Sequence, residues 1–209
     1  MTRAEVFALA GPVGQIEAKL EFPDGSEATP AFFGVACHPH PLYGGTMDNK
    51  VTHVLARAMN ECGAPCFRFN FRGVGASAGT FDNGRGEADD LAMVVAEGRR
   101  RFPGAGLWLG GFSFGAFVAL RGAQNLAPEK LLAVAPPVAR FELGSVAHPD
   151  CDWLLVQGDA DDVVPPEAVL SWAAEQQRKP RLHVLAGAGH FFHGRLHELK
   201  PLLIDFLRS

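Results

Sequence analysis

Short apolar runs alternate with amphipathic segments along this chain. The runs have the length of buried strands, and they lie at Ala31–Cys37, Pro65–Asn70, just ahead of Ser113, Leu131–Ala135, Trp153–Gln157 and Arg181–Leu185. From Thr46 on, apolar residues recur at the i, i+3, i+4, i+7, i+8 spacing of a helix with one core-facing stripe, namely Val51, Val54, Leu55, Ala58 and Met59. This alternation predicts an α/β fold, a mostly parallel twisted sheet with helices on both faces.

Three further segments complete the predicted elements. Gln15–Phe22 is expected to form an early antiparallel strand that ends in the turn Pro23-Asp24-Gly25. A helix from Glu87 to Arg101 begins with acids and ends with bases, which complements the helix dipole and indicates a structural role for these charges. The last helix begins near Leu196, and Pro201 is expected to kink or split it.

A serine stands between two glycines in the segment Gly111-Phe112-Ser113-Phe114-Gly115. The run before it predicts a strand, and the run after it predicts a helix. Because glycine has no Cβ, the two elements can approach closely while the serine adopts strained dihedral angles that expose its hydroxyl. A G-x-S-x-G turn at such a junction indicates a nucleophile. The alternative is a tight glycine turn whose serine only caps the helix.

A serine hydroxyl attacks only when a base takes its proton, and that base needs an orienting acid. Three aspartates follow the strand over residues 153–157, and we assign the role of the acid to Asp161. Asp159 is expected to hold its own turn, and Asp162 is expected to face solvent. His190 follows the next strand in a glycine-rich loop, and we assign it as the base.

The third requirement is a pair of donors for the oxyanion. The backbone N–H of Phe114, the residue after the serine, is one expected donor. The second is expected from the His38-Pro39-His40-Pro41 loop after an early strand. Since proline has no N–H, we favour the backbone of His40, with Leu42 or Tyr43 left open. The alternative is a stiff turn that shapes the cleft without donating.

Several segments together resemble the small bacterial, lidless α/β-hydrolases related to dienelactone hydrolases and carboxylesterases. They are HPHPLYGGTMDNKV, RFNFRGVGASAGTFDNGRGEADD, GFSFGA, APP, QGDADDVVP and GHFFHGRL, and the resemblance runs from about residue 15 to the C-terminus. It implies an α/β-hydrolase fold with an eight-stranded type of core and a serine-hydrolase mechanism. Dienelactone hydrolases use a cysteine nucleophile, whereas this chain carries Ser113, so the resemblance does not extend to that activity.

The segment Val138–Cys151 is too short for the helical cap that many α/β-hydrolases insert at this point. We therefore predict an open cleft with no cap domain and with apolar, aromatic walls. The expected substrate-binding residues are Leu42, Tyr43, Phe141 and Phe191. Phe192 is also expected in the wall, whereas Phe112 and Phe117 are expected in the core.

Composition narrows the possible functions. With 209 residues, we expect a single domain over residues 1–209. The net charge of −4 disfavours a nucleic-acid surface, no run approaches a membrane span, and the cysteines Cys37, Cys62, Cys66 and Cys151 suggest free thiols in the cytoplasm. The glycine-rich run after Asn70 lacks the Lys-Ser/Thr of a phosphate loop, and Arg72 beside it is a possible cleft wall.

The predicted function is therefore hydrolysis of small or short-chain carboxylic esters by Ser113, Asp161 and His190, with no cofactor. The spacing of His190, His193 and His197 fits no standard zinc pattern, so we expect no metal. Thioesterase, lactonase, amidase and peptidase activities stay open. The alternative of another class is a ligand-binding or receptor module without turnover.

Overall fold

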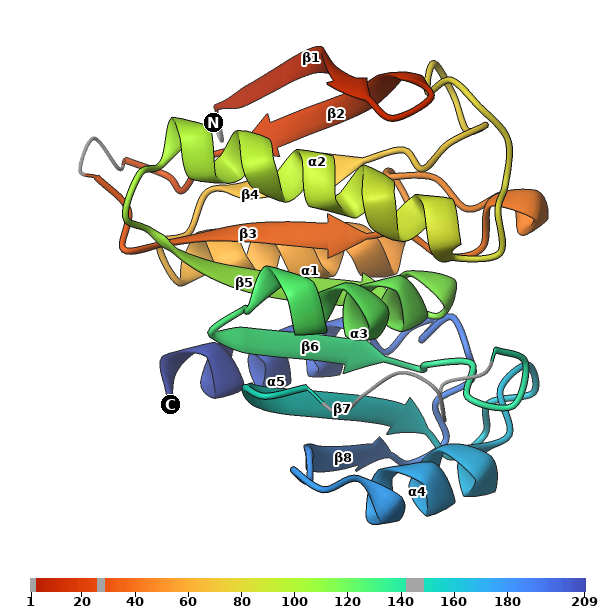
Figure 1. Ribbon diagram of the computed structural model, residues 1–209. Coiled ribbons are helices and arrows are strands. Elements are labelled where there is room, and N and C mark those ends of the chain that lie inside the picture. The colour runs from red at the N-terminus through yellow and green to blue at the C-terminus, as the bar shows by residue number, and fades with distance from the viewer. Residues whose placement is uncertain (1–2, 26–28, 142–148) are drawn as a thin grey trace.

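The computed structural model describes residues 3–25, 29–141 and 149–209 (Figure 1). Eight strands form one sheet in the order β1-β2-β4-β3-β5-β6-β7-β8. The strands are β1 (Ala4–Gly11), β2 (Gly14–Glu21), β3 (Phe32–Cys37), β4 (Cys66–Phe69), β5 (Gly106–Phe112), β6 (Lys130–Val134), β7 (Asp152–Gly158) and β8 (Arg181–Leu185). Along the sheet, every neighbouring pair from β4 through β3, β5, β6 and β7 to β8 is parallel, whereas β2 pairs antiparallel with both β1 and β4.

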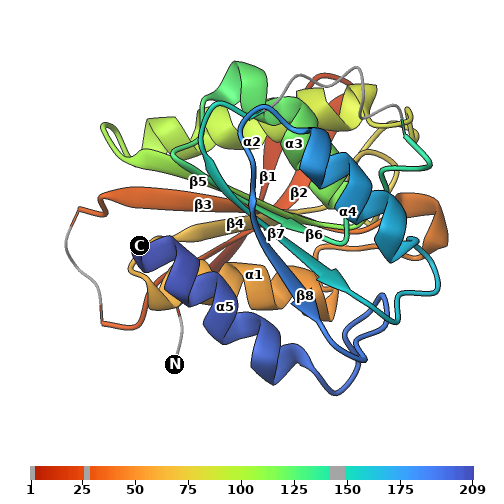
Figure 2. The ribbon, with the colours of Figure 1, turned by 90° about the horizontal axis from the view of Figure 1, so that it is seen from below.

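Helices cover both faces of this sheet. They are α1 (Lys50–Glu61), α2 (Arg85–Arg101), α3 (Phe114–Leu126), α4 (Pro166–Glu175) and α5 (Leu196–Arg208), and a short 3-10 turn, η1, spans Pro41–Tyr43. Figure 2 shows α1 and α5 on one side of the sheet and α2, α3 and α4 on the other. Each face encloses its own buried apolar cluster. This architecture is the predicted α/β-hydrolase fold, with no cap domain among the described residues.

The N-terminal strand β1 is absent from the sequence prediction. It pairs along its whole length with β2, from Ala4 opposite Glu21 to Gly11 opposite Gly14. Its side chains alternate between exposed and half-buried, and Val6 is 70% exposed at the edge of the sheet. An edge strand with so little apolar burial lacks the continuous apolar run by which the inner strands are recognised.

Two helices differ from their predicted form. Helix α1 begins at Lys50 rather than at Thr46, because the Asn49 side chain accepts hydrogen bonds from the N–H groups of Val51 and Thr52 and caps the helix there. Helix α5 is continuous through Pro201 and is not split. The missing N–H costs one bond near the start of the helix, which the buried apolar face of α5 offsets.

Two of the acids at the start of α2, Glu87 and Asp90, are structural, as predicted, and are buried. The Glu87 carboxylate accepts hydrogen bonds from the backbone N–H groups of Gly84 at 2.7 Å and Asp82 at 2.8 Å. Asp90 is fully buried and accepts two hydrogen bonds from the Arg72 guanidinium, at 2.9 and 3.0 Å. The prediction that Arg72 lines the cleft is therefore wrong. Its charge is used to bind the segment after β4 to α2.

Residues 142–148 lie outside the described residues, so the segment Val138–Cys151 that suggested an uncapped fold is described only at its two ends. The four cysteines are free thiols. In the described ranges of the chain, no helix is both long and apolar enough to cross a membrane.

Replacing Asp90 by Asn is expected to lower the free energy of unfolding by about 3–5 kcal/mol, because the charge of Arg72 then stays buried without its counter-ion. Urea denaturation measures the change. Asp89→Asn is the matched control, since Asp89 is the adjacent residue of α2 and is exposed, and its loss is expected to stay within about 0.5 kcal/mol. Equal losses in the two variants would contradict this account of α2.

Candidate active site

Ser113 occupies the junction between β5 and α3, with φ 54° and ψ −121°. A Cβ on Gly111 would lie 2.1 Å from the Gly115 carbonyl oxygen, and a Cβ on Gly115 would lie 2.3 Å from that of Cys37. Both positions therefore require glycine. The Ser113 N–H donates to the Val134 carbonyl oxygen of β6 at 2.8 Å, which helps to hold the strained serine at the end of the sheet.

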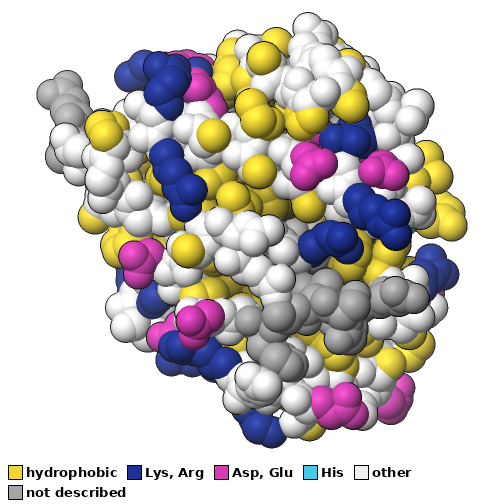
Figure 3. All heavy atoms as spheres, viewed as in Figure 1, with side chains coloured by type: hydrophobic (Ala, Val, Ile, Leu, Met, Phe, Trp, Pro, Cys, Tyr) yellow, Lys and Arg dark blue, Asp and Glu magenta, His cyan; other side chains and the backbone are white. Residues whose placement is uncertain are grey.

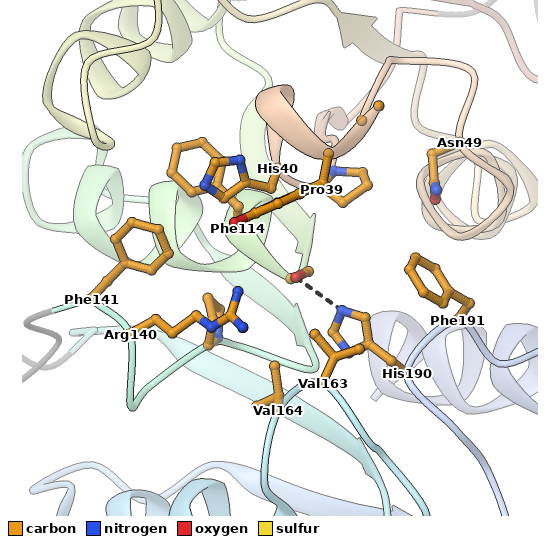
Figure 4. Close-up of a pocket in the computed structure, with 15 residues that line it drawn as sticks. Pro39, His40, Asn49, Phe114, Arg140, Phe141, Val163, Val164, His190 and Phe191 are labelled. Carbon is orange, nitrogen blue, oxygen red and sulfur yellow. Dashed lines mark hydrogen bonds between the residues drawn. The ribbon is translucent and has the colours of Figure 1, made fainter.

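The structure brings Ser113, His190 and Asp161 into one hydrogen-bonded chain. The Ser113 hydroxyl lies 3.1 Å from His190 Nε2, the dashed bond in Figure 4, and His190 Nδ1 lies 2.8 Å from Asp161 Oδ2. An Nδ1–H that donates to Asp161 leaves Nε2 free to accept the serine proton. His190 is only 3% exposed, and the Phe112 ring lies against its imidazole with the centroids 5.0 Å apart.

The Asp161 carboxylate is held by the backbone around it. Its Oδ1 accepts from the N–H groups of Val163 at 2.9 Å and Val164 at 2.7 Å, and its Oδ2 also accepts from Gln157 Nε2 at 3.0 Å. Burial by itself raises the pKa of the Asp161 carboxyl, but the hydrogen bonds from His190, Val164 and Val163 outweigh it and keep the pKa below its ordinary value. Asp161 is therefore ionised at neutral pH and fixed in orientation.

The other two aspartates of this loop have different positions. Asp159 binds another loop rather than its own turn, as its carboxylate accepts from the N–H of Gly187 at 2.5 Å in the loop after β8. It thereby ties the loop that carries Asp161 to the loop that carries His190. Asp162 is exposed, as expected.

The loop after β3 presents the backbone N–H of His40. The Pro39 carbonyl oxygen accepts a hydrogen bond of 2.6 Å from His38 Nδ1. In a trans peptide the C=O and the following N–H point in opposite directions, so the N–H of His40 points away from His38. Neither this N–H nor that of Phe114 has a hydrogen-bond partner in the described part of the chain, whereas the N–H of Leu42 donates to His40 Nδ1 at 3.2 Å.

His38 is the residue that sequence reasoning missed in this loop. It is fully buried, and its Nε2 accepts from the Phe71 N–H at 3.0 Å while its Nδ1–H binds Pro39. Burial lowers the pKa of His38 to about 4, although the bond to Pro39 acts in the opposite sense. The imidazole is therefore neutral, in one tautomer, and it orients the Pro39–His40 peptide.

A cavity of about 420 Å³ opens in front of Ser113 and His190 (Figure 4). Of the predicted wall residues, it is lined by Tyr43, Phe141 and Phe191. Leu42 is not a lining residue, and its side chain is 68% exposed. Phe192 is fully buried in the core rather than in the wall.

Two polar side chains at the cavity were not predicted. Asn49 lines it while its Oδ1 caps α1. Arg140 lines it from the segment after β6. In the sequence Asn49 is visible only as a cap residue ahead of an amphipathic helix, and nothing distinguishes Arg140 from a surface arginine. Of the other histidines, His193 and His197 are exposed.

Known proteins similar to this chain share its fold. A serine hydrolase without a lid from Xanthomonas campestris is 42% identical, with a TM-score of 0.94 over 100% of this chain and 95% of that one. An α/β serine hydrolase homologue from Coxiella burnetii is 45% identical, with a TM-score of 0.93 over 99% and 98%. An uncharacterised protein from Rickettsia prowazekii is 34% identical over 94% of this chain and 86% of its own length.

More distant solved structures share the fold alone. A dienelactone hydrolase from Anabaena variabilis is 16% identical, with a TM-score of 0.80 over 99% of this chain and 97% of that one. No protein-family model matches the chain.

Folding stability is expected to fall in acid because of His38. A histidine ordinarily titrates near 6.5, so His38 in the unfolded chain becomes protonated below that pH. In the folded protein the pKa of His38 is about 4, so the residue stays neutral there until the pH is much lower. The stabilisation is complete above about pH 6.5 and is lost as the pH falls toward 4, by about 2 kcal/mol at pH 5. Urea denaturation across this range should show a smaller loss in His38→Gln than in the unmodified protein.

The difference between these two proteins isolates His38. The pKa values of His40 and His53 are also lowered by burial, but both residues are present in both proteins. His197→Gln, which removes an exposed histidine, should keep the unmodified pH profile. The same acid loss in His38→Gln as in the unmodified protein would refute a neutral, buried His38.

Proposed function

Because the chain belongs to the family of α/β serine hydrolases without a lid, we propose that it hydrolyses small carboxylic esters through an acyl-serine intermediate on Ser113. The observation that carries the proposal is the continuous hydrogen-bonded chain from Ser113 Oγ through His190 to Asp161, with steps of 3.1 and 2.8 Å. It stands at the wall of a cavity that a small substrate can enter.

Acylation begins when the ester carbonyl carbon lies against Ser113 Oγ. As the hydroxyl attacks, its proton passes to His190 Nε2, and Asp161 stabilises the imidazolium and holds its orientation. The carbonyl oxygen becomes an oxyanion that accepts from the N–H groups of His40 and Phe114. The tetrahedral intermediate then collapses, the bond to the alcohol oxygen breaks, and His190 Nε2 returns the proton to the leaving alcohol.

Deacylation repeats these steps with water. His190 Nε2 takes a proton from a water molecule as its oxygen attacks the acyl-serine carbonyl. The second oxyanion uses the same two N–H groups, and its collapse breaks the bond to Ser113 Oγ. The proton passes from His190 to the serine, which regenerates the hydroxyl and releases the carboxylic acid. In both half-reactions, every proton passes through His190 Nε2.

The cavity favours short acyl groups. Its walls are largely apolar, with the aromatic side chains Tyr43, Phe114, Phe141 and Phe191. Tyr43 is 76% exposed and Phe191 is 45% exposed, so the walls are low and a long chain would leave much of its length in water. Rates on model esters are therefore expected to fall from short to long acyl chains.

Ser113→Ala is expected to lower kcat/KM for para-nitrophenyl acetate by about 10⁴-fold or more, because the substitution removes the hydroxyl that forms the acyl intermediate. A fluorophosphonate probe should modify Ser113 in the unmodified protein and leave the variant unlabelled, as read by mass spectrometry. Ser171→Ala is the matched control, since Ser171 is exposed on α4. If Ser113→Ala hydrolyses the ester as fast as the unmodified protein, the proposed mechanism is wrong.

Gly45→Ala tests the oxyanion donor of the His40 loop. A Cβ at this position would lie 2.1 Å from the Pro39 carbonyl oxygen, so the Pro39–His40 peptide must rotate or shift. Loss of one oxyanion donor costs about 10²–10³-fold in kcat, and the decrease is expected in that range. Gly63→Ala adds a strained residue in the turn after α1, away from the site, and controls for general loss of stability. Full activity of Gly45→Ala would exclude the His40 N–H as a donor.

A further inference from the structure

We propose that the preferred substrates are esters whose acyl group ends in a carboxylate, with Arg140 binding that carboxylate at the inner cavity and Arg121 and Arg85 extending the subsite outward. The inference rests on the proposed ester hydrolysis, since it assigns the part of the substrate that lies beyond the reacting carbonyl. It is carried by the position of Arg140, by a second cavity that continues from it, and by the direction in which the leaving alcohol departs.

Arg140 is a cation in the substrate cavity without a carboxylate partner among the described residues. By contrast, Arg68 is neutralised by Glu21 at 2.8 Å and Arg72 by Asp90 at 2.9 Å. The charge of Arg140 acts on the cavity itself. Burial and, after it, the Arg140 charge lower the pKa of His40 on the opposite wall. A positive group left unpaired beside a nucleophile is suited to a substrate anion.

A second cavity of about 510 Å³ continues outward from Arg140 and Phe141, which line both cavities. Arg121 of α3 and Arg85 of α2 also line it. Neither has a carboxylate partner in the described segments, and Arg85 occupies the first residue of α2, where the helix dipole disfavours a cation. Such a placement does not stabilise the helix and is consistent with a role in binding.

One acidic residue opposes these charges. Asp82 also lines the second cavity, and its Oδ2 accepts from the N–H of Gly86 at 3.1 Å. With three arginines against one aspartate, the lining keeps an excess of positive charge in a chain whose net charge is −4. Figure 3 shows Lys and Arg side chains gathered over α2 and α3, beside hydrophobic and acidic ones.

Two aromatic rings stand among these charges. The rings of Phe117 and Phe141 stack with their centroids 4.6 Å apart and 19° between their planes, and both line the second cavity. Phe117 is buried beneath Phe141, so methylene groups of an acyl chain can lie against the half-buried Phe141 ring while the terminal group of the chain reaches a guanidinium. The planar guanidinium matches a carboxylate with two parallel hydrogen bonds.

The direction of the reaction assigns this region to the acyl group. The leaving alcohol takes its proton from His190 Nε2 and must therefore depart on the side of that nitrogen. In Figure 4, Phe191 and Asn49 lie on the His190 side of the dashed bond, and Arg140 and Phe141 lie on the opposite side. The acyl group thus faces Arg140, and the alcohol faces Phe191.

The test compares two esters that differ only in the charge at the acyl terminus. Monoethyl succinate ends in a carboxylate, and ethyl levulinate has a methyl ketone of the same size in its place. The unmodified protein is expected to show a kcat/KM about tenfold higher for the succinate ester, which corresponds to about 1.4 kcal/mol. Arg140→Gln should bring the ratio of the two kcat/KM values close to one, and Arg140→Lys should keep part of it.

Control experiments separate the effect of a charge at the proposed subsite from the effect of a charge elsewhere on the protein. Arg181→Gln removes an exposed arginine at the start of β8 and should keep both the ratio and the basal rate. Salt at about 1 M should reduce the ratio in the unmodified protein, because it screens exposed charges. Arg121→Gln should lower the corresponding ratio for monoethyl adipate over ethyl 6-oxoheptanoate more than the ratio for the shorter pair.

The outcomes distinguish this inference from the proposed function. Equal kcat/KM values for the succinate and levulinate esters in the unmodified protein, unchanged in Arg140→Gln, would overturn the inference and leave ester hydrolysis intact. If neither ester nor para-nitrophenyl acetate is hydrolysed, the proposed function fails. In that case the affinity of the subsite is measured by titrating monoethyl succinate into Ser113→Ala and monitoring binding by nuclear magnetic resonance. Binding that is at least tenfold weaker with Arg140→Gln added supports the subsite, and equal binding refutes it.

Discussion

The close contact between the end of β5 and the start of α3 is the constraint on which the site depends. A side chain on Gly111 would collide with the backbone of Gly115, and one on Gly115 would collide with the end of β3. Because both positions are glycine, three segments of backbone can pack together at one point. This packing places Ser113 in its strained conformation beside the loop of His38 and His40, so the nucleophile and the proposed oxyanion donors are positioned by the same contact.

The parallel sheet brings the remaining groups to that point. The carboxyl ends of parallel strands lie at one edge of a sheet, and ligands bind there. The loops after β7 and β8 meet at this edge through two carboxylates of one loop, since Asp159 binds the N–H of Gly187 and Asp161 binds His190. The first bond positions the loop, and the second orients the imidazole. Two of the aspartates of one short loop therefore serve structure and chemistry separately.

Much of this arrangement could be predicted from the sequence, because the inner strands and the serine turn are each encoded by a recognisable local pattern of residues. The inner strands are continuous apolar runs, and the order of Ser113, Asp161 and His190 follows the order of the loops. The half-exposed edge strand β1 lacks such a run. The role of His38 was also missed, because its neutrality depends on burial beneath Phe71, and burial arises only when distant segments pack.

Arg72 and Arg140 show why the sequence leaves the charge of the site undecided. Arg72 follows β4 and is the arginine that the sequence analysis expects at the cleft, whereas Arg140 lies in the segment after β6 and carries no such signal. Arg72 meets the buried carboxylate of Asp90 and is removed from the cavity, whereas Arg140 meets no carboxylate in the described chain and stays in the cavity wall. A buried ion pair offsets both charges, so the arginine that lacks one sets the electrostatic potential that a substrate encounters. The specificity of an uncapped site of this kind is therefore determined as much by which charges the fold neutralises as by which residues line it.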